Sequence, residues 1–193
     1  MHSIQTTLGL VISSRPYGEA GKILLIFTKE LGLVSVIAQG IRLEKSKLRP
    51  FTQDHSLGLF SLVRGKEFWR LTSANQIDSQ NLSLREDREL VARLAVLLKR
   101  FVQGEDPHPK LFDLIIGCRT FLQKSQALSD EQFRTLESFV VFQIMKELGY
   151  IGKDSLLDDY SSSQITLELI NQLSPQRQVM NQHINKALKE SQL

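Results

Sequence analysis

The stretch that decides the fold is residues 6–32, T-T-L-G-L-V-I-S-S-R-P-Y-G-E-A-G-K-I-L-L-I-F-T-K-E-L-G. Thr6–Ser13 alternates in polarity and Ile23–Thr28 is a continuous apolar run, so we expect a strand on either side of the turn at Pro16-Tyr17-Gly18. Further strand-like segments follow at Leu33–Gln39, Leu57–Val63 and Phe68–Thr72. Five such segments within about 80 residues, without a long helical period, indicate a small barrel or sandwich.

Beyond residue 80 the apolar period becomes that of helices. Ser83-Leu84-Arg85-Glu86 and Ser129-Asp130-Glu131-Gln132 have the form of capping boxes, which satisfy the first backbone N–H groups of a helix. Pro109 suits the first turn of a second helix, Gly149 suits a helix end, and Ser174-Pro175 suits the start of the last helix. We therefore expect an α+β chain with the strands first: a β-barrel domain over residues 1–80 and an all-helical domain over 81–193.

The composition is that of an ordinary globular protein, with 41% hydrophobic and 23% charged residues among 193. An apolar run long enough for a membrane span and an N-terminal signal sequence are both absent, so we expect a cytoplasmic protein that does not contact membranes. The net charge of +3 is unevenly distributed. Residues 1–80 hold ten Lys and Arg against six Asp and Glu, whereas residues 81–193 hold fourteen against fifteen. This asymmetry favours an anionic partner for the first domain.

The most cationic segment is Ile41–Arg49, I-R-L-E-K-S-K-L-R, which follows Gly40 at the end of the third expected strand. Against the single Glu44 it holds four cations: Arg42, Lys45, Lys47 and Arg49. A bound anion would relieve the repulsion among them, and a nucleic-acid backbone supplies one with the release of counterions. A solvated loop that only keeps the protein soluble remains the open alternative, because basic runs are common.

Aromatic side chains could add stacking to this charge. Tyr17 lies in the first turn, and Phe68-Trp69 begins the last expected strand. Because neighbouring side chains of a strand face opposite ways, we expect one of Phe68 and Trp69 in the core and the other at the surface. An exposed ring stacks on a base with about 1–3 kcal/mol. The alternative for each ring is that it only covers an edge of the core.

Patterns typical of catalysis are missing. The sequence contains neither G-x-x-x-x-G-K-[ST] nor G-x-G-x-x-G, and its four histidines are scattered, so we expect no nucleotide cofactor and no metal site. Cys118 falls on an apolar helix face and is expected to be a small buried side chain. Asp158 and Asp159 would be the carboxylate pair of a metal-dependent nuclease, but adjacent acids in a serine-rich loop are usually solvated. We therefore expect a protein that is not an enzyme and has no catalytic residue.

Four segments resemble, in order, the RecO family of bacterial DNA repair and recombination mediators. Residues 6–32 resemble its first strand, its Y-G-E turn and its second strand ending in T-x-x-x-G. Gly40, Arg42, Ser46 and Arg49 match its basic-loop pattern G-x-R-x-x-x-S-x-x-R. Residues 104–112, G-E-D-P-H-P-K-L-F, resemble its link into a helix, and residues 139–151 resemble its L-G-Y segment. The resemblance covers about residues 5–151.

The resemblance implies a five-stranded OB-fold barrel followed by a helical domain. It also implies binding to single- and double-stranded DNA in the nucleoid, annealing of complementary strands, and partnership with RecR and with the C-terminal tail of the single-strand binding protein SSB, so that RecA can be loaded. Many family members carry a four-cysteine zinc module after the L-G-Y segment, but residues 151–164 contain no cysteine here. We therefore expect a short, zinc-free form in which the role of residues 152–193 is open.

These expectations assign residues to two surfaces. The DNA-binding surface is expected to comprise Arg15, Tyr17, Lys22, Arg42, Lys45, Lys47, Arg49, Trp69 and Arg70. The carboxylates of the SSB tail are expected to meet four helical cations, each of which has solvation as its alternative: Arg100, Arg119, Lys124 and Arg134. Phosphate contacts do not read bases, so binding should tolerate any sequence. The runner-up function is a protein-interaction adaptor, in which the OB barrel binds a protein and the basic loop is incidental.

Overall fold

The computed structural model of the chain describes residues 3–75, 85–124, 128–152 and 164–191. Its contacts form two compact units, and each is described by itself. The first unit joins Met1–Leu82 with Val91–Phe112, and the second joins Ser83–Leu90 with Asp113–Leu193. Most of the first helix is therefore grouped with the barrel in one unit, while a domain boundary near residue 80 remains a prediction.

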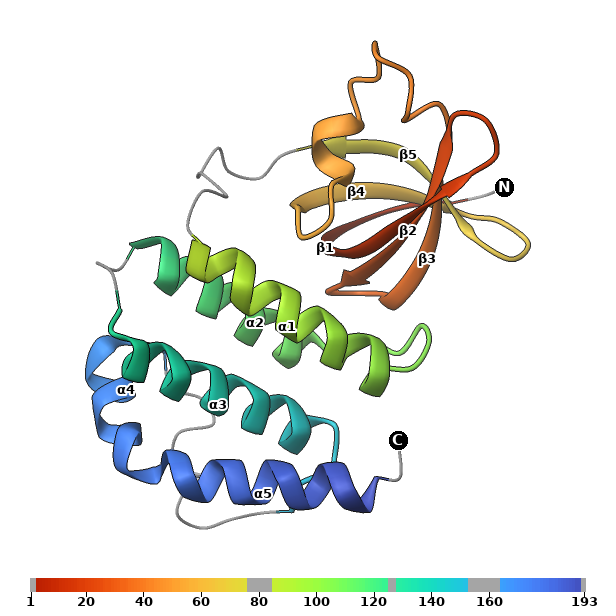
Figure 1. Ribbon diagram of the computed structural model, residues 1–193. Coiled ribbons are helices and arrows are strands. Elements are labelled where there is room, and N and C mark those ends of the chain that lie inside the picture. The colour runs from red at the N-terminus through yellow and green to blue at the C-terminus, as the bar shows by residue number, and fades with distance from the viewer. Residues whose placement is uncertain (1–2, 76–84, 125–127, 153–163, 192–193) are drawn as a thin grey trace. The chain divides into compact units, whose positions relative to one another are not determined.

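Five strands of the first unit close into a barrel (Figure 1). They are β1 Ile4–Tyr17, β2 Gly21–Thr28, β3 Gly32–Ala38, β4 Leu57–Arg64 and β5 Trp69–Asn75. The order around the barrel is β1-β2-β3-β5-β4, and β4 pairs again with β1. All pairs are antiparallel except β3 with β5, where Val36 and Ile37 lie beside Trp69 and Arg70. The expected OB-fold followed by helices is confirmed.

Alternation along the strands fills the barrel. In β3 every second residue is buried, which places Val34, Val36 and Ala38 inside. They belong to a core cluster that draws on every strand: Val11, Leu24, Ile26, Val34, Val36, Ala38, Ile41, Phe60, Leu62, Trp69 and Ala74. Gly9 also faces this interior, because a Cβ there would lie 2.7 Å from Cγ2 of Ile26. The barrel is therefore a packed core without space for a ligand at that point.

Strand β1 is longer than the Thr6–Ser13 segment that alternation predicts. It pairs with β4 over Ile4–Leu10 and with β2 over Gly9–Tyr17, and its register with β2 shifts between Val11 and Ser13. A bulge of this kind bends and twists a strand, which allows one strand to belong to two sides of a closed barrel. Because alternation breaks at the bulge, the sequence pattern does not predict the second half of β1.

The link between α1 (Arg85–Phe101) and α2 (Pro109–Lys124) packs on the start of β3 within the first unit. The backbone N–H of Leu33 donates to the carbonyl oxygen of Gly104 at 3.0 Å. Gly32 has a φ of 72°, and a Cβ there would lie 2.3 Å from the carbonyl oxygen of Asp106. Glycine is therefore required at position 32 both by backbone conformation and by the approach of the link.

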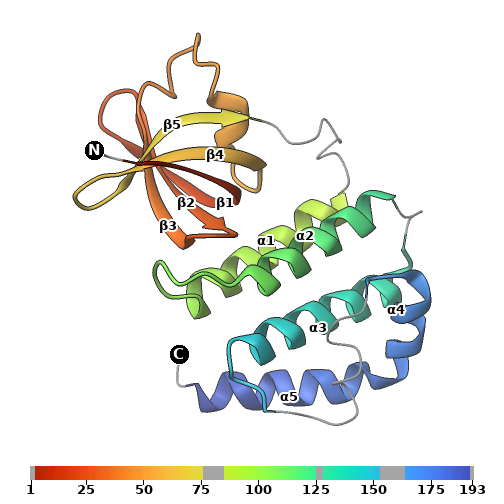
Figure 2. The same cartoon turned by 180° about the vertical axis from the view of Figure 1, so that it is seen from behind.

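The second unit contains α3 Asp130–Glu147, α4 Leu167–Leu173 and α5 Arg177–Glu190, with the short 3-10 helix η3 Ser174–Gln176 between the last two. Helix α3 contacts both α4 and α5, and α3 and α5 lie side by side in both views (Figure 2). The rings of Phe142 and His183 meet edge to face, with centroids 6.1 Å apart. Apolar faces spaced at the helical period thus find their partners within the unit.

Two helix boundaries confirm sequence expectations. Ser129 Oγ accepts a hydrogen bond from the backbone N–H of Gln132, whose side chain accepts one from the backbone N–H of Ser129, so the second capping box is present. Gly149 follows the end of α3 with a φ of 80°, as a helix-stop glycine does. The capping box expected at Ser83 lies outside the described residues.

A buried ion pair joins α1 to α2 in the second unit. Nε and Nη2 of Arg119 donate to the two carboxylate oxygens of Asp87, each at 3.0 Å, and both side chains are almost fully buried. The neighbouring Cys118 is fully buried, as expected from its apolar helix face. Burial, and secondarily the charge of Asp87, raise the pKa of the Cys118 thiol far above its ordinary range.

Replacing Gly32 with Ala should lower the free energy of unfolding by about 2–5 kcal/mol, because a left-handed φ and an overpacked contact each contribute. Gly18→Ala is the matched control, since Gly18 has a φ of 58° but a Cβ there would have nothing within 4 Å. Only the conformational penalty of about 1–2 kcal/mol is expected there. Urea denaturation of both variants measures the difference, and equal losses would contradict the close approach at Gly32.

Replacing Asp87 with Asn should destabilise the fold by about 3–5 kcal/mol, because the buried Arg119 guanidinium loses its counter-charge. Lys186→Ala serves as the control, since Lys186 and Glu190 form an exposed pair with 3.9 Å between Nζ and Oε1. Removing that pair should change stability by only about 0.3–0.5 kcal/mol. The same denaturation measurement compares the two variants. Equally small effects would show that the buried pair has no structural role.

Candidate nucleic-acid interface

The basic loop belongs to residues 39–56, the segment between β3 and β4. Ile41 is buried in the barrel core, and Leu48 and Phe51 pack against the same core. The 3-10 helix η1, Arg49–Thr52, forms part of the segment. Because these apolar side chains hold the segment on the barrel, its charged side chains remain exposed to solvent: Arg42, Glu44, Lys45, Lys47, Arg49 and Asp54.

Backbone hydrogen bonds fix the segment at both ends. Near its start, the N–H of Arg42 donates to the carbonyl oxygen of Ala20 in the β1–β2 turn at 2.9 Å. Near its end, the N–H of His55 donates to the carbonyl oxygen of Val11 at 2.7 Å, and the N–H of Val11 donates to the carbonyl oxygen of Ser56 at 2.9 Å. The cations of the segment are therefore presented from a loop that is tied to strand β1 and to the turn after it.

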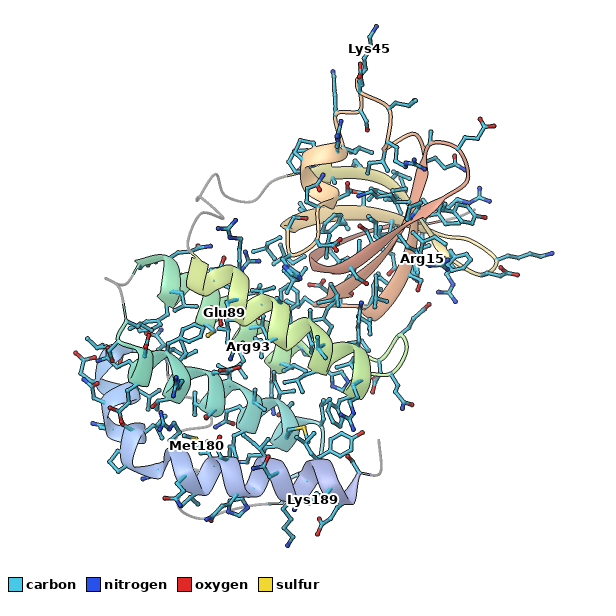
Figure 3. The ribbon with its side chains drawn as sticks, in the orientation of Figure 1. Arg15, Lys45, Glu89, Arg93, Met180 and Lys189 are labelled. Atoms are coloured by element: carbon cyan, nitrogen blue, oxygen red, sulfur yellow. The ribbon has the colours of Figure 1, made fainter. Side chains whose placement is uncertain are left out.

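A cavity of about 260 Å³ lies beside this segment, and we call it the cationic cavity. It is lined by Lys22, Ile41, Arg42, Arg49, Thr52 and Gln53. Three of these are cations that the sequence assigns to DNA binding, and no acidic residue of the described ranges is among the lining residues. The structure thus brings together Lys22 from β2 with Arg42 and Arg49 from the segment. Lys45 and Lys47 stay outside the cavity, and Lys45 projects from the outer end of the segment (Figure 3).

Arg15 and Arg70 lie on the outer wall of the barrel and do not line the cavity. The strand register connects the two arginines. Arg15 lies opposite Ile23 of β2, and Ile23 lies opposite Ile37 of β3. Ile37 in turn lies opposite Arg70 of β5. The two arginines are therefore three strands apart around the curved outer wall of the barrel. Tyr17, at the end of β1, is 46% exposed. These three residues are exposed on the barrel outside the cationic cavity.

Trp69 does not lie at the surface, which corrects its assignment as a stacking platform. It is 5% exposed and belongs to the barrel core, and the guanidinium carbon of Arg64 lies 5.2 Å from the centre of its ring. Alternation correctly places one of Phe68 and Trp69 inside, but it does not say which. Tyr17 is therefore the aromatic residue of the assigned surface that has a face open to solvent.

Arg119 is a second correction, because its guanidinium is 4% exposed and is engaged by Asp87. The other three assigned tail contacts are exposed or partly exposed. The guanidinium carbon of Arg100 lies 5.3 Å from the centre of the Phe101 ring, in the first unit. Lys124 and Arg134 belong to the second unit. Their role in binding an acidic peptide remains a prediction.

Thr52 and Gln53 are the polar lining residues that sequence reasoning missed, and Ile41 is the apolar one. The hydroxyl of Thr52 and the amide of Gln53 donate to the carbonyl oxygen of Arg49 at 3.2 and 2.9 Å. The one signal for this turn is Pro50, which occupies the first turn of η1 and favours a helical start. A single proline in a basic run does not distinguish a 3-10 turn from an open loop.

The described ranges contain neither a group of side chains suited to a metal ion nor a helix suited to crossing a membrane. They contain no group of three or more His, Cys, Asp or Glu that could hold a metal ion. None of the helices there combines the length and the hydrophobicity that crossing a membrane requires. Asp158 and Asp159, the acidic pair considered for a nuclease, lie outside the described residues.

Comparison with known proteins matches residues 1–80 to the family described as "Recombination protein O N terminal". The chain is 31% identical over 147 residues to the DNA repair protein RecO of Bacillus velezensis, covering 75% of this chain and 54% of the relative. It is 30% identical over 144 residues to RecO of Clostridium perfringens, covering 74% and 57%. It is 36% identical over 130 residues to RecO of Alkaliphilus metalliredigens, covering 65% and 51%.

The chain spans about half the length of the curated relatives it matches. The matched region includes the closed barrel and the basic segment between β3 and β4. Residues 1–80 are therefore a Recombination protein O N-terminal domain, and the chain is similar to RecO proteins over about three quarters of its length.

Proposed function

We propose that the chain acts in DNA repair and recombination as a non-enzymatic mediator that binds DNA through its OB barrel. The observation that carries this proposal is the cationic cavity, where Lys22, Arg42 and Arg49 meet without an acidic residue in the lining. Cations held together in this way repel one another, and a phosphate backbone relieves the repulsion. The names of the relatives, DNA repair protein RecO, support the same function.

The strand would run from the cavity along the outer side of the basic segment. Lys45 and Lys47 are exposed there and can neutralise further phosphates. Arg15 and Arg70, exposed on the barrel wall, extend the positive surface, and Tyr17 offers a face for a base. Because these contacts address phosphates and the π-face that every base has, binding is expected to tolerate any sequence.

Annealing follows from the same charges without covalent chemistry. A protein that neutralises two backbones lowers their mutual repulsion and lets complementary bases pair. In the cell this activity would act on single strands coated by SSB, together with RecR, so that RecA can be loaded. These partners and the preference for single- or double-stranded DNA are part of the proposal, which rests on the resemblance to the family.

Single-stranded DNA binding should weaken with salt, and Arg42, Lys45, Lys47 and Arg49 should contribute about −3 to the slope of log K against log salt, at roughly −0.7 for each phosphate contact. Replacing all four with Ala should make the slope shallower by that amount. Fluorescence anisotropy of a labelled oligonucleotide at several salt concentrations, without metal, gives the slope. The charge-matched control replaces four exposed lysines elsewhere: Lys99, Lys110, Lys186 and Lys189.

An unchanged slope in the loop variant, or an equal change in the control, would remove the basic segment from the interface. If the unmodified chain does not bind DNA even at low salt, the proposal fails as a whole. The barrel would then be an adaptor for a protein partner, the runner-up function, and binding to candidate proteins would be measured instead.

For the helical part, we expect binding of the acidic, apolar C-terminal tail of SSB. The Lys124→Ala and Arg134→Ala exchanges in the second unit should each weaken binding several-fold, as loss of one exposed charge contact of about 0.5–1 kcal/mol would. Anisotropy of a labelled tail peptide measures this, with Lys186→Ala as the control. Absence of binding to the peptide at low salt would dismiss this partner.

A further inference from the structure

We propose that the cationic cavity is a site for a terminal phosphate monoester, such as the phosphorylated end of a DNA strand. This inference rests on the proposed DNA binding and assigns different tasks to the cations of the basic segment. Lys22, Arg42 and Arg49 enclose the terminal phosphate, whereas Lys45 and Lys47 contact the continuing backbone. A DNA end and a free nucleotide share this chemistry, and the experiment below separates them.

Charge favours a monoester over the diester within a strand. A phosphate monoester carries about −1.5 to −2 charges at neutral pH and three terminal oxygens, whereas a diester carries a single charge on two. Three cations line the cavity, and none of its other lining residues is charged. The planar guanidinium groups of Arg42 and Arg49 can each bind two oxygens, and the ammonium group of Lys22 supplies a third positive charge. The number and type of these donors match the monoester.

The volume of the cavity sets the size of the ligand. The cavity has a volume of about 260 Å³ and is partly open to solvent. A phosphate with its attached sugar fits this space, whereas a base pair would extend beyond it. The cavity therefore fits the end of one strand better than the side of a duplex.

The cavity is built before any ligand arrives. Lys22 is held on β2, where its partner in register is the core residue Ala38, and its Nζ lies 3.4 Å from Ser14 Oγ. The carbonyl oxygen of Arg49 accepts hydrogen bonds from the side chains of Thr52 and Gln53, which closes the turn of η1. A site whose backbone is already ordered loses less entropy on binding, so a small anion can be held there.

The cavity adjoins the usual OB-fold surface and extends it. Oligonucleotides bind OB-folds along strands β2 and β3 and the loops after β1 and β4. The cavity takes Lys22 from β2, lies beside the β1–β2 turn, and adds residues of the segment that connects β3 to β4. Its two arginines belong to that connecting segment, so they can recognise a strand end while the barrel wall with Arg15 and Arg70 holds another part of the strand.

The test compares two oligonucleotides of one sequence, both labelled at the 3′ end, with either a phosphate or a hydroxyl at the 5′ end. Anisotropy with the full chain should give about tenfold tighter binding of the phosphorylated strand, as one added charge-assisted contact would. Arg42→Ala with Arg49→Ala should bring this ratio close to one. Lys45→Ala with Lys47→Ala, which removes the same charge from the same segment outside the cavity, should weaken both strands and keep the ratio.

A ratio of one for the unmodified chain at low salt, with no competition by adenosine 5′-monophosphate, would overturn the inference. So would a ratio that persists in the Arg42 and Arg49 variant, once circular dichroism shows that the variant is folded. The strand with a 5′-hydroxyl keeps the two proposals separate. If it binds with the expected salt dependence while the ratio is one, the general DNA interface stands and the end site falls.

If the cavity binds the phosphate of a free nucleotide rather than a DNA end, the measurements give a different result. Adenosine 5′-monophosphate, with adenosine as its matched control, should raise the melting temperature of the chain and lose this effect in the Arg42 and Arg49 variant. If the nucleotide acts and neither oligonucleotide binds, the cavity is confirmed as a monoester site and the proposed DNA interface fails. Discrimination between the two oligonucleotides assigns the site to DNA ends.

Discussion

Closure of the barrel through the parallel contact of β3 with β5 is the constraint on which the rest of the structure depends. Val36 and Ile37 meet Trp69 and Arg70 there, and this short pairing completes the ring of strands. Because β3 pairs with β5, the chain must cross over the barrel to begin β4. Residues 39–56 make that crossing, and Ile41, Leu48 and Phe51 attach it to the core. The position of the cations is thus a consequence of strand order.

The arginine in the helical unit is paired with an acidic residue, whereas the cations beside the barrel line a cavity without one. In the second unit Arg119 is neutralised by Asp87 at two 3.0 Å contacts, so this guanidinium is part of the fold. Beside the barrel, Lys22, Arg42 and Arg49 line one cavity without an acidic residue of the described ranges among them. A cation that folding leaves without compensation is available to a ligand. The contrast is the reason why we propose the DNA interface on the barrel rather than around Arg119.

The sequence predicts strand positions and the basic segment well, because alternation and charge density are local. It does not predict that Lys22 joins Arg42 and Arg49, since that grouping depends on how β2 lies against the crossing segment. It places Arg119 at the surface because the partner, Asp87, lies 32 residues away and no local pattern connects them. It leaves Trp69 two possible faces, and only the register with β3 selects one. Errors of this kind come from long-range contacts.

The burial of Cys118 keeps the thiol of the chain unreactive in the native state. Thiolate, not thiol, reacts with alkylating agents and peroxides, and the raised pKa together with full burial keeps this sulfur protonated and shielded. Because Cys118 is the chain's one cysteine, any reaction of a thiol reports opening of the helical unit around Asp87 and Arg119. The native protein therefore carries a built-in chemical probe of its own unfolding, and a second cysteine placed on the exposed basic segment could be labelled selectively.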